Sequence, residues 1–399
     1  MNKKVNWLAF FVLFFPVIID AINGYINLGG GKETSLLATL YKGAILVYSF
    51  KYALKSKYSS LIKSLTGIYL CCFFYQSFYY GTNLSDFIKI IYPFFVAGLC
   101  LTHPKLKDSK ICYNYLLAYG AVACIIILVC SFTGFGYNQY GTIIGNRGLF
   151  RAGNDIGLAM LLLNCIAVYM YQHTKKVCYL ILFLLLSSSC LLIATTAGIA
   201  GTILVFLGII ISVLFIRNKD YRAGFSIKIG LILFAFFVVT FVFSYLIETI
   251  HSVDYLSYKF ENVETRFTQS SGRSELVESA LMAFQHYSFF DWLFGASNFY
   301  HYYIGEQLFG TKILASAEVD FYDLVGCYGI LCTILVLFIP LKYVCLSLAS
   351  YVKSRKIEMF WILWINLIFI SCAFYAGHAF TAITPFTIFM VVNSIKFSK

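Results

Sequence analysis

Long apolar segments separated by short polar ones run through most of the 399-residue chain. Many of the apolar segments hold roughly 17–25 residues, the length that an α-helix needs to cross a bilayer. The alternation of apolar and polar positions that marks membrane β-strands is absent from them. The pattern therefore predicts an all-α, polytopic helical membrane protein that forms a single integral membrane domain over residues 1–399.

About twelve transmembrane helices fit the pattern. The apolar run 177–216 has 40 residues and is too long for one span, so we expect it to turn back at 194–201, where glycines permit a tight bend. The N-terminal segment resembles a signal peptide but lacks a small-residue cleavage site, which predicts an uncleaved first helix. The expected spans are 7–22, 35–50, 64–80, 87–101, 112–131, 155–171, 177–193, 198–216, 229–247, 318–340, 359–376 and 380–395.

Composition and charge agree with a membrane class. The chain is 60% hydrophobic and only 12% charged, whereas a soluble chain carries roughly 25% charged residues. The net charge of +12 has a topological explanation, because 21 of the 30 Lys and Arg residues fall in short loops or tails on one predicted side. This positive-inside pattern puts both termini in the cytoplasm and requires no nucleic-acid partner.

One segment, 248–316, is too polar for the membrane. It holds eight of the chain's 18 Asp and Glu residues and lies between the predicted ninth and tenth helices. The topology makes it a large extracytoplasmic loop. Inside it, we expect a short helix from Ser274 to about Gln285, with Glu275 in the first turn and an apolar face.

Arginines are scarce on the predicted outer side. Arg147 and Arg151 are four residues apart and would share a face if that stretch is helical. Arg266 and Arg273 lie in the large loop. The planar arginine fork suits phosphate or pyrophosphate, which makes these residues candidates for binding an anionic substrate; pairing with nearby acids or lipid headgroups is the alternative.

Two lysines, Lys42 and Lys89, lie inside apolar spans near their predicted outer ends. A cation within the membrane is costly and usually faces a polar cavity or a partner. Snorkelling of the long side chain to the interface is the alternative. Both lysines are therefore further candidates for substrate binding.

Candidate proton acceptors gather near the ends of two late spans. Glu318, Asp320 and Asp323 crowd the entry to the span at 318–340, and neighbouring carboxylates raise one another's pKa, as a general base requires. An interface cluster or a cation site is the alternative. His378, at a helix boundary, has an imidazole suited to proton transfer, although a structural histidine is the alternative.

No cofactor motif is visible. The thirteen cysteines lie in or beside apolar stretches, and no His/Cys spacing indicates a metal site. P-loop and GxGxxG motifs are absent. A reaction on the outer face would therefore need a substrate that is already activated.

Four stretches of the chain resemble the family of O-antigen polymerases and O-antigen ligases, as does the predicted topology. The resemblance is carried by GNRGLFRAGNDIGLAM (145–160), LLIATTAGIAG (191–201), SGRSELVESALMAF (271–284) with the WLFGAS that follows, and AEVDFYDLVGCYGIL (317–331). The second stretch lacks a basic residue common in the family. The fourth is acidic where ligases commonly carry a His, which favours a polymerase.

The resemblance implies a glycosyltransferase of the bacterial inner membrane that polymerises oligosaccharide repeats linked to undecaprenyl pyrophosphate, for O-antigen, capsule or exopolysaccharide, without metal or nucleotide. It implies that Arg147, Arg151 and Arg273, helped by Lys89, stabilise the departing pyrophosphate. The base would be Glu318, Asp320 or His378. Expected partners are the lipid-linked donor and acceptor, membrane lipid, a flippase and a chain-length regulator. A ligase or a flippase for lipid-linked oligosaccharides is the alternative.

Overall fold

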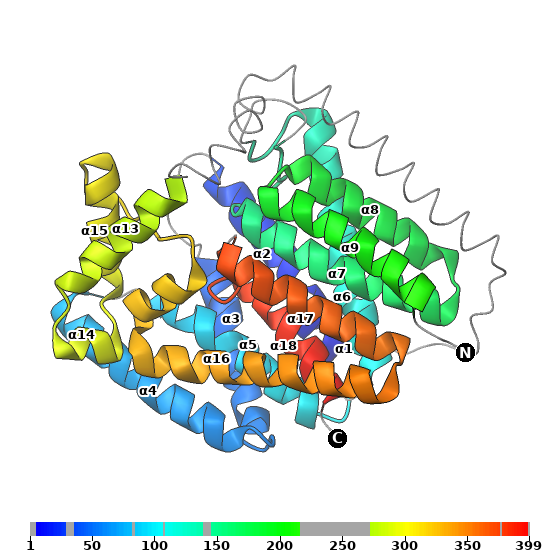
Figure 1. The fold of residues 1–399 in the computed structure, drawn as a ribbon, viewed down its shortest axis with the longest axis horizontal. Helices are drawn as coiled ribbons and strands as arrows, with labels where there is room; N and C mark the ends of the chain where they lie inside the picture. Colours follow the sequence, from blue (N-terminus) through cyan, green and yellow to red (C-terminus); the bar gives the residue numbers. More distant parts are fainter. Residues whose placement is uncertain are drawn as a thin grey trace.

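The computed structural model describes residues 5–28, 36–81, 84–106, 108–138, 145–215, 272–375 and 377–397. These residues form a helical bundle without strands, so the all-α prediction is confirmed for them (Figure 1). The elements are α1 (Trp7–Ala9), the π-helix η1 (Phe10–Phe14), α2 (Pro16–Asn27), α3 (Leu36–Ala53), α4 (Ser59–Tyr79), α5 (Leu84–Thr102), α6 (Ser109–Thr133), α7 (Gly153–Thr174), α8 (Val177–Ile193), α9 (Thr196–Phe215), α13 (Gly272–Gln285), α14 (Phe289–Phe294), α15 (Ser297–Phe309), α16 (Asp320–Ser354), α17 (Ile357–Tyr375) and α18 (Ile383–Lys396).

Eleven of the twelve predicted spans coincide with these helices, and the span at 229–247 lies outside the described residues. Four described helices, α6, α7, α16 and α17, are long and apolar enough to cross a membrane. A fifth span results if the first helices, which bend by 42° at Pro16, count as one. The structure thus supports several membrane helices, whereas the count of twelve stays a prediction.

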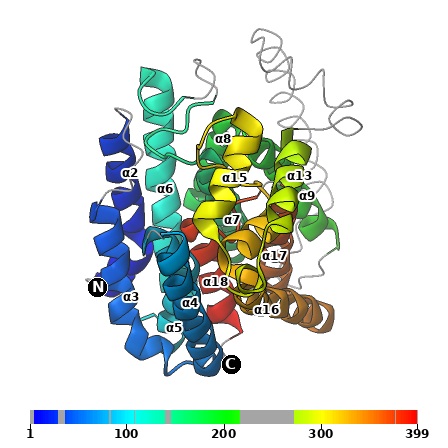
Figure 2. The same cartoon turned by 90° about the vertical axis from the view of Figure 1, so that its left-hand side faces the viewer.

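Helix α7 lies at the centre of the bundle. Most of its side chains are buried, and it packs against α8, α9, α17 and α18. Helix α5 packs against α3 and α18. Figure 2 shows α2, α3 and α6 along one side of the bundle and α16 and α17 along the other. The first turns of α5 and α7 therefore stand near α2 and α3, where a cavity forms.

The described part of the predicted outer loop, 272–316, is mostly helical. Helices α13, α14 and α15 form a lobe that packs on α16 and α4 (Figure 1). The predicted end of the first helix at Gln285 and the position of Glu275 in its first turn are confirmed, although α13 begins at Gly272, two residues before Ser274. Residues 248–271 lie outside the described part, so the extent of the loop stays a prediction.

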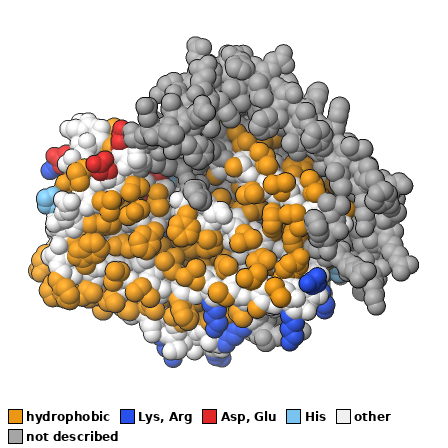
Figure 3. All heavy atoms as spheres, viewed as in Figure 1, with side chains coloured by type: hydrophobic (Ala, Val, Ile, Leu, Met, Phe, Trp, Pro, Cys, Tyr) orange, Lys and Arg blue, Asp and Glu red, His pale blue; other side chains and the backbone are white. Residues whose placement is uncertain are grey.

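A broad apolar surface covers the face in Figure 3, crossing the sides of several helices. Lys and Arg side chains gather along its lower edge, and acidic side chains appear at its upper left. An apolar band with Lys and Arg side chains along one edge is the expected surface of a helical membrane protein.

Candidate functional site

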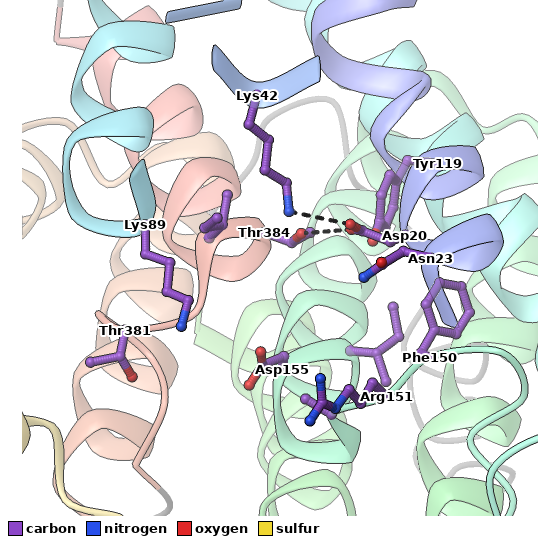
Figure 4. Close-up of a pocket in the computed structure, with 13 residues that line it drawn as sticks. Asp20, Asn23, Lys42, Lys89, Tyr119, Phe150, Arg151, Asp155, Thr381 and Thr384 are labelled. Atoms are coloured by element: carbon purple, nitrogen blue, oxygen red, sulfur yellow. Dashed lines mark hydrogen bonds and ion pairs between the residues drawn. The ribbon is translucent and has the colours of Figure 1, made fainter. Parts of the chain in front are cut away.

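A cavity of about 380 Å³ opens inside this bundle, between α2, α3, α5, α6, α7 and the segment that leads into α18 (Figure 4). Its polar lining includes three cationic and two acidic side chains. The lining residues are Asp20, Asn23, Lys42, Lys89, Tyr119, Phe150, Arg151, Ala152, Asp155, Ile156, Thr381, Ile383 and Thr384. The structure thus brings Lys42, Lys89 and Arg151, three residues singled out from sequence, to one place.

Lys42 is fixed in the cavity by an acid on the neighbouring helix. Its Nζ lies 3.4 Å from Oδ1 of Asp20 on α2, and the hydroxyl of Thr384 donates to Oδ2 of the same carboxylate at 3.4 Å. The bend at Pro16 starts α2, the helix that carries Asp20, in a new direction. Because Lys42 already faces a partner inside the bundle, its charge does not need to reach the membrane interface.

Lys89 enters the cavity from the first turns of α5. Figure 4 shows its amino group and the carboxylate of Asp155 pointing into the same space. The charge of Lys89 acts on Asp155. Its position by a polar cavity is the one that sequence reasoning predicted for an intramembrane lysine that does not snorkel.

Arg147 and Arg151 do not share a helical face, because residues 145–152 form turns and a single bridge between Asn138 and Asn146. Arg151 lines the cavity just before α7. Arg147 lies outside the lining, with its guanidinium over the ring of Tyr137, 5.5 Å from the ring centre. Of these two arginines, therefore, Arg151 has the position that fits substrate contact.

Asp20 and Asp155 were missed by sequence reasoning. Asp155 lies in the first turn of α7 and lines the cavity, where Lys89 and the imidazole of His378 act on it electrostatically. A signal was present in both cases. Asp20 interrupts an apolar span, as Lys42 does, and Asp155 follows Arg151 by four residues in a motif already singled out.

Asp320 and Asp323, at the start of α16, are 1% and 2% exposed and lie outside the lining. Asp320 accepts hydrogen bonds from the backbone amides of Ala379 and Phe380, at 2.6 and 2.9 Å, and a third, at 3.1 Å, from the hydroxyl of Thr381. Asp323 accepts from the amide of Ala317 at 2.8 Å and from the hydroxyl of Tyr300 at 3.1 Å. The two carboxylates therefore anchor backbone and neighbouring side chains.

The backbone of Glu318 packs against Gly377, the residue before His378. Glu318 and His378 both have positive φ angles, 54° and 61°, and Gly377 packs so closely that an added Cβ would lie 2.2 Å from the carbonyl oxygen of Glu318. Neither Glu318 nor His378 lines the cavity. His378 nevertheless belongs to the same segment as the cavity-lining Thr381, which places it beside the site.

Arg273 lies in the first turn of α13, but its side chain is outside the described part, as is all of Arg266. The roles predicted for these two arginines therefore stay predictions.

In the lobe formed by α13, α14 and α15, Asp291 links α14 to α4, because Tyr75 and Tyr80 each donate to its Oδ1 at 2.8 Å. Burial raises the pKa of Asp291, but hydrogen bonds from Ser288, Tyr80 and Tyr75 outweigh it and leave the pKa below its ordinary value.

Among the described residues, no group of three or more His, Cys, Asp or Glu side chains is arranged to hold a metal ion. The cavity offers instead three cations with many N–H donors, Lys42, Lys89 and Arg151. Such a set suits an anionic group with several oxygens.

The chain matches no protein-family model and no curated protein. The functional conclusion therefore depends on the cavity and on the patterns of the sequence.

Proposed function

We propose that this chain is a glycosyltransferase of the bacterial inner membrane that polymerises undecaprenyl-pyrophosphate-linked oligosaccharide repeats. The observation that carries the proposal is the cavity inside an apolar helical bundle with Lys42, Lys89 and Arg151 in its lining. Cations are expensive in such a bundle and mark the path or the binding site of a charged substrate. A pyrophosphate on a lipid is a substrate that presents its charge there.

The size and charge of the cavity agree with this substrate. About 380 Å³ falls within the range of roughly 300–1,000 Å³ that is usual for small-molecule sites. A pyrophosphate and part of one sugar fit this space, while the remaining glycan would extend outward. Arg151 offers a planar fork for two phosphate oxygens, and the lysines add point charges.

The proposed reaction transfers the growing glycan from its lipid carrier to the next repeat. A hydroxyl of the acceptor sugar attacks the anomeric carbon of the donor, and undecaprenyl pyrophosphate leaves with the bonding electrons. Preorganised cations lower the barrier because they stabilise negative charge as it develops on the departing oxygen. Glu318, Asp320 and His378 are the bases predicted from sequence. All three lie outside the lining, and His378 and Asp320 act electrostatically on the cavity carboxylate of Asp155.

The proposed topology puts the cavity toward the outer side, with twelve spans, both termini in the cytoplasm and the 248–316 loop outside. Support comes from the direction of two lining helices. Lys89 lies near the start of α5, whose end precedes the basic segment 105–110, and Asp155 starts α7, which Lys175 and Lys176 follow. The lining residues therefore stand at the helix ends away from the basic loops, which mark the cytoplasmic side.

The test is to delete the gene in its native host and separate the surface glycan by length on a gel. The proposal predicts that long chains vanish while a single-repeat form stays attached, and that Arg151→Ala fails to restore them. Long chains that persist on undecaprenyl and never reach their anchor would indicate a ligase. Single lipid-linked repeats trapped on the cytoplasmic leaflet would indicate a flippase.

A matched control separates charge at the site from charge in general. Lys353, exposed in the last turn of α16, lies among the basic residues away from the cavity. Complementation with Lys353→Gln should restore the wild-type ladder of chain lengths.

A further inference from the structure

We propose that Asp155 is the general base of this site, the group that takes the proton from the attacking hydroxyl of the acceptor sugar. The inference rests on the proposed function and deepens it. It differs from the sequence prediction, which named Glu318, Asp320 or His378 for the role. The structure assigns it to Asp155 on three grounds: position, availability and neighbours.

The position of Asp155 is set by the start of α7. The chain leaves the turns at 145–152 and enters the helix at Gly153, so that the carboxylate of Asp155 projects from the first turn into the cavity (Figure 4). Arg151 lines the same cavity from just before that turn, and Lys89 lines it from α5. A base must stand near both the acceptor and the leaving pyrophosphate, and the lining places Asp155 beside the cations that would bind the pyrophosphate.

Asp155 is also the available carboxylate. Asp20, the other acid in the lining, is engaged by Lys42 and Thr384. Asp320 is buried and accepts three hydrogen bonds from the 379–381 segment. Among the residues drawn in Figure 4, none is joined to the carboxylate of Asp155 by a hydrogen bond or ion pair, so its oxygens can receive a proton from substrate.

The neighbours of Asp155 carry both signs of charge. Lys89 on α5 and His378 before α18 attract its carboxylate, and Asp20 on α2 and Asp320 on α16 repel it.

The proposed proton transfer accompanies the exchange of bonds at the anomeric carbon. The acceptor oxygen forms a bond to the anomeric carbon, the bond from that carbon to the pyrophosphate oxygen breaks, and the hydroxyl proton moves to Asp155. The proton is then released to solvent, which restores the carboxylate.

The experiment uses the full chain in lipid nanodiscs with a synthetic undecaprenyl-pyrophosphate-linked repeat unit, and measures kcat and the Kd of the lipid-linked unit separately. We expect Asp155→Asn to lower kcat at least ~100-fold while the Kd changes by less than about threefold, because the amide keeps the shape of the side chain but cannot accept the proton. Asp155→Glu should restore part of the turnover. The fall of wild-type kcat at acid pH should be absent in Asp155→Asn.

The outcomes separate this inference from the proposed function. If the wild-type protein makes no longer glycan, the proposed function fails. If the wild type polymerises and Asp155→Asn keeps kcat within threefold, or loses donor binding in proportion to turnover, the inference alone fails. His378→Gln is the competing variant. If kcat of His378→Gln no longer falls at acid pH, while Asp155→Asn keeps the wild-type pH dependence of kcat, His378 is the base. If Asp155→Asn does not fold, a wild-type kcat in Asp155→Ser or the absence of any rescue by Asp155→Glu would overturn the assignment.

Discussion

The carboxylates near the site fall into two kinds. Asp320 and Asp323 crowd together in the sequence, and the fold surrounds each with hydrogen-bond donors from backbone and side chains. Asp20 and Asp155 are 135 positions apart, and the fold places both in the lining of one cavity with three cations. Acids that cluster along the chain thus stabilise the structure, whereas acids that are far apart form the polar site.

The difference teaches what a carboxylate needs for chemistry. A carboxylate whose oxygens already accept several hydrogen bonds is well suited to fixing a loop, and giving up those bonds to take a proton is costly. Asp155 faces the cavity, and no hydrogen bond or ion pair joins it to the other residues drawn in Figure 4, so it retains its lone pairs for the substrate. The two kinds should therefore respond differently to substitution: one through stability, the other through turnover.

The largest effect is expected for Asp320→Ala. The substitution leaves the amides of Ala379 and Phe380 and the hydroxyl of Thr381 without their acceptor, and each buried unsatisfied group costs roughly 1–3 kcal/mol. We expect the free energy of unfolding to fall by about 3–5 kcal/mol, as measured by denaturant unfolding in detergent. The matched control is Glu306→Ala on the exposed face of α15, which should change it by less than about 0.5 kcal/mol.

Unchanged stability in Asp320→Ala would contradict the distinction between the two kinds of carboxylate.

Asp155→Asn provides the other half of the comparison. It should change the free energy of unfolding by less than about 1 kcal/mol, since no hydrogen bond or ion pair joins Asp155 to the other residues drawn in Figure 4.

The second effect is on turnover. Lys89→Gln removes a cation from the cavity lining while keeping a long polar side chain. We expect kcat/KM for polymerisation of the lipid-linked repeat to fall about 100-fold, which corresponds to the loss of one electrostatic contact to the developing charge. Lys353→Gln should stay at the wild-type value. Equal losses in the two variants would mean that overall positive charge, rather than the cavity, matters.

Much of the helical fold could be predicted because it depends on local patterns. Eleven of the predicted apolar spans coincide with described helices, and the turn within 177–216 was expected at 194–201 and occurs at Ala194, where φ is 54°. The glycines have a different role from the predicted one. They lie within α9, where an added Cβ on Gly201 would lie 2.2 Å from Leu161 of α7. They allow close helix packing, which a single sequence does not reveal.

The site could be predicted only in part. Lys42 and Lys89 were found because a cation inside an apolar segment is unusual wherever the chain folds, and Arg151 was found because basic residues are scarce on the predicted outer side. Which acids face these cations depends on the bend at Pro16 and on the packing of α5, α7 and α18, and therefore on contacts between residues far apart in sequence. For the same reason the acids at 318–323 could be located but not recognised as structural anchors.

The smallest effect is expected for Asp291→Asn, a carboxylate of the first kind that lies outside the bundle. Its hydrogen bonds from Tyr75, Tyr80 and Ser288 hold its pKa below the ordinary value of 3.8, so its ionised form stabilises the lobe formed by α13, α14 and α15. This stabilisation is complete above the ordinary value and is lost as the pH falls through the lower pKa of the folded protein. The amide lacks the charge that strengthens these bonds, so Asp291→Asn should lower the free energy of unfolding by about 1 kcal/mol at neutral pH. Below pH 3.8 the difference in free energy of unfolding between variant and wild type should shrink, as followed by denaturant unfolding across pH.

Turnover of Asp291→Asn should not change, because Asp291 lies outside the cavity lining. A variant that kept its stability but lost turnover would instead place this lobe in the reaction. That result would overturn the division between anchoring and reacting carboxylates.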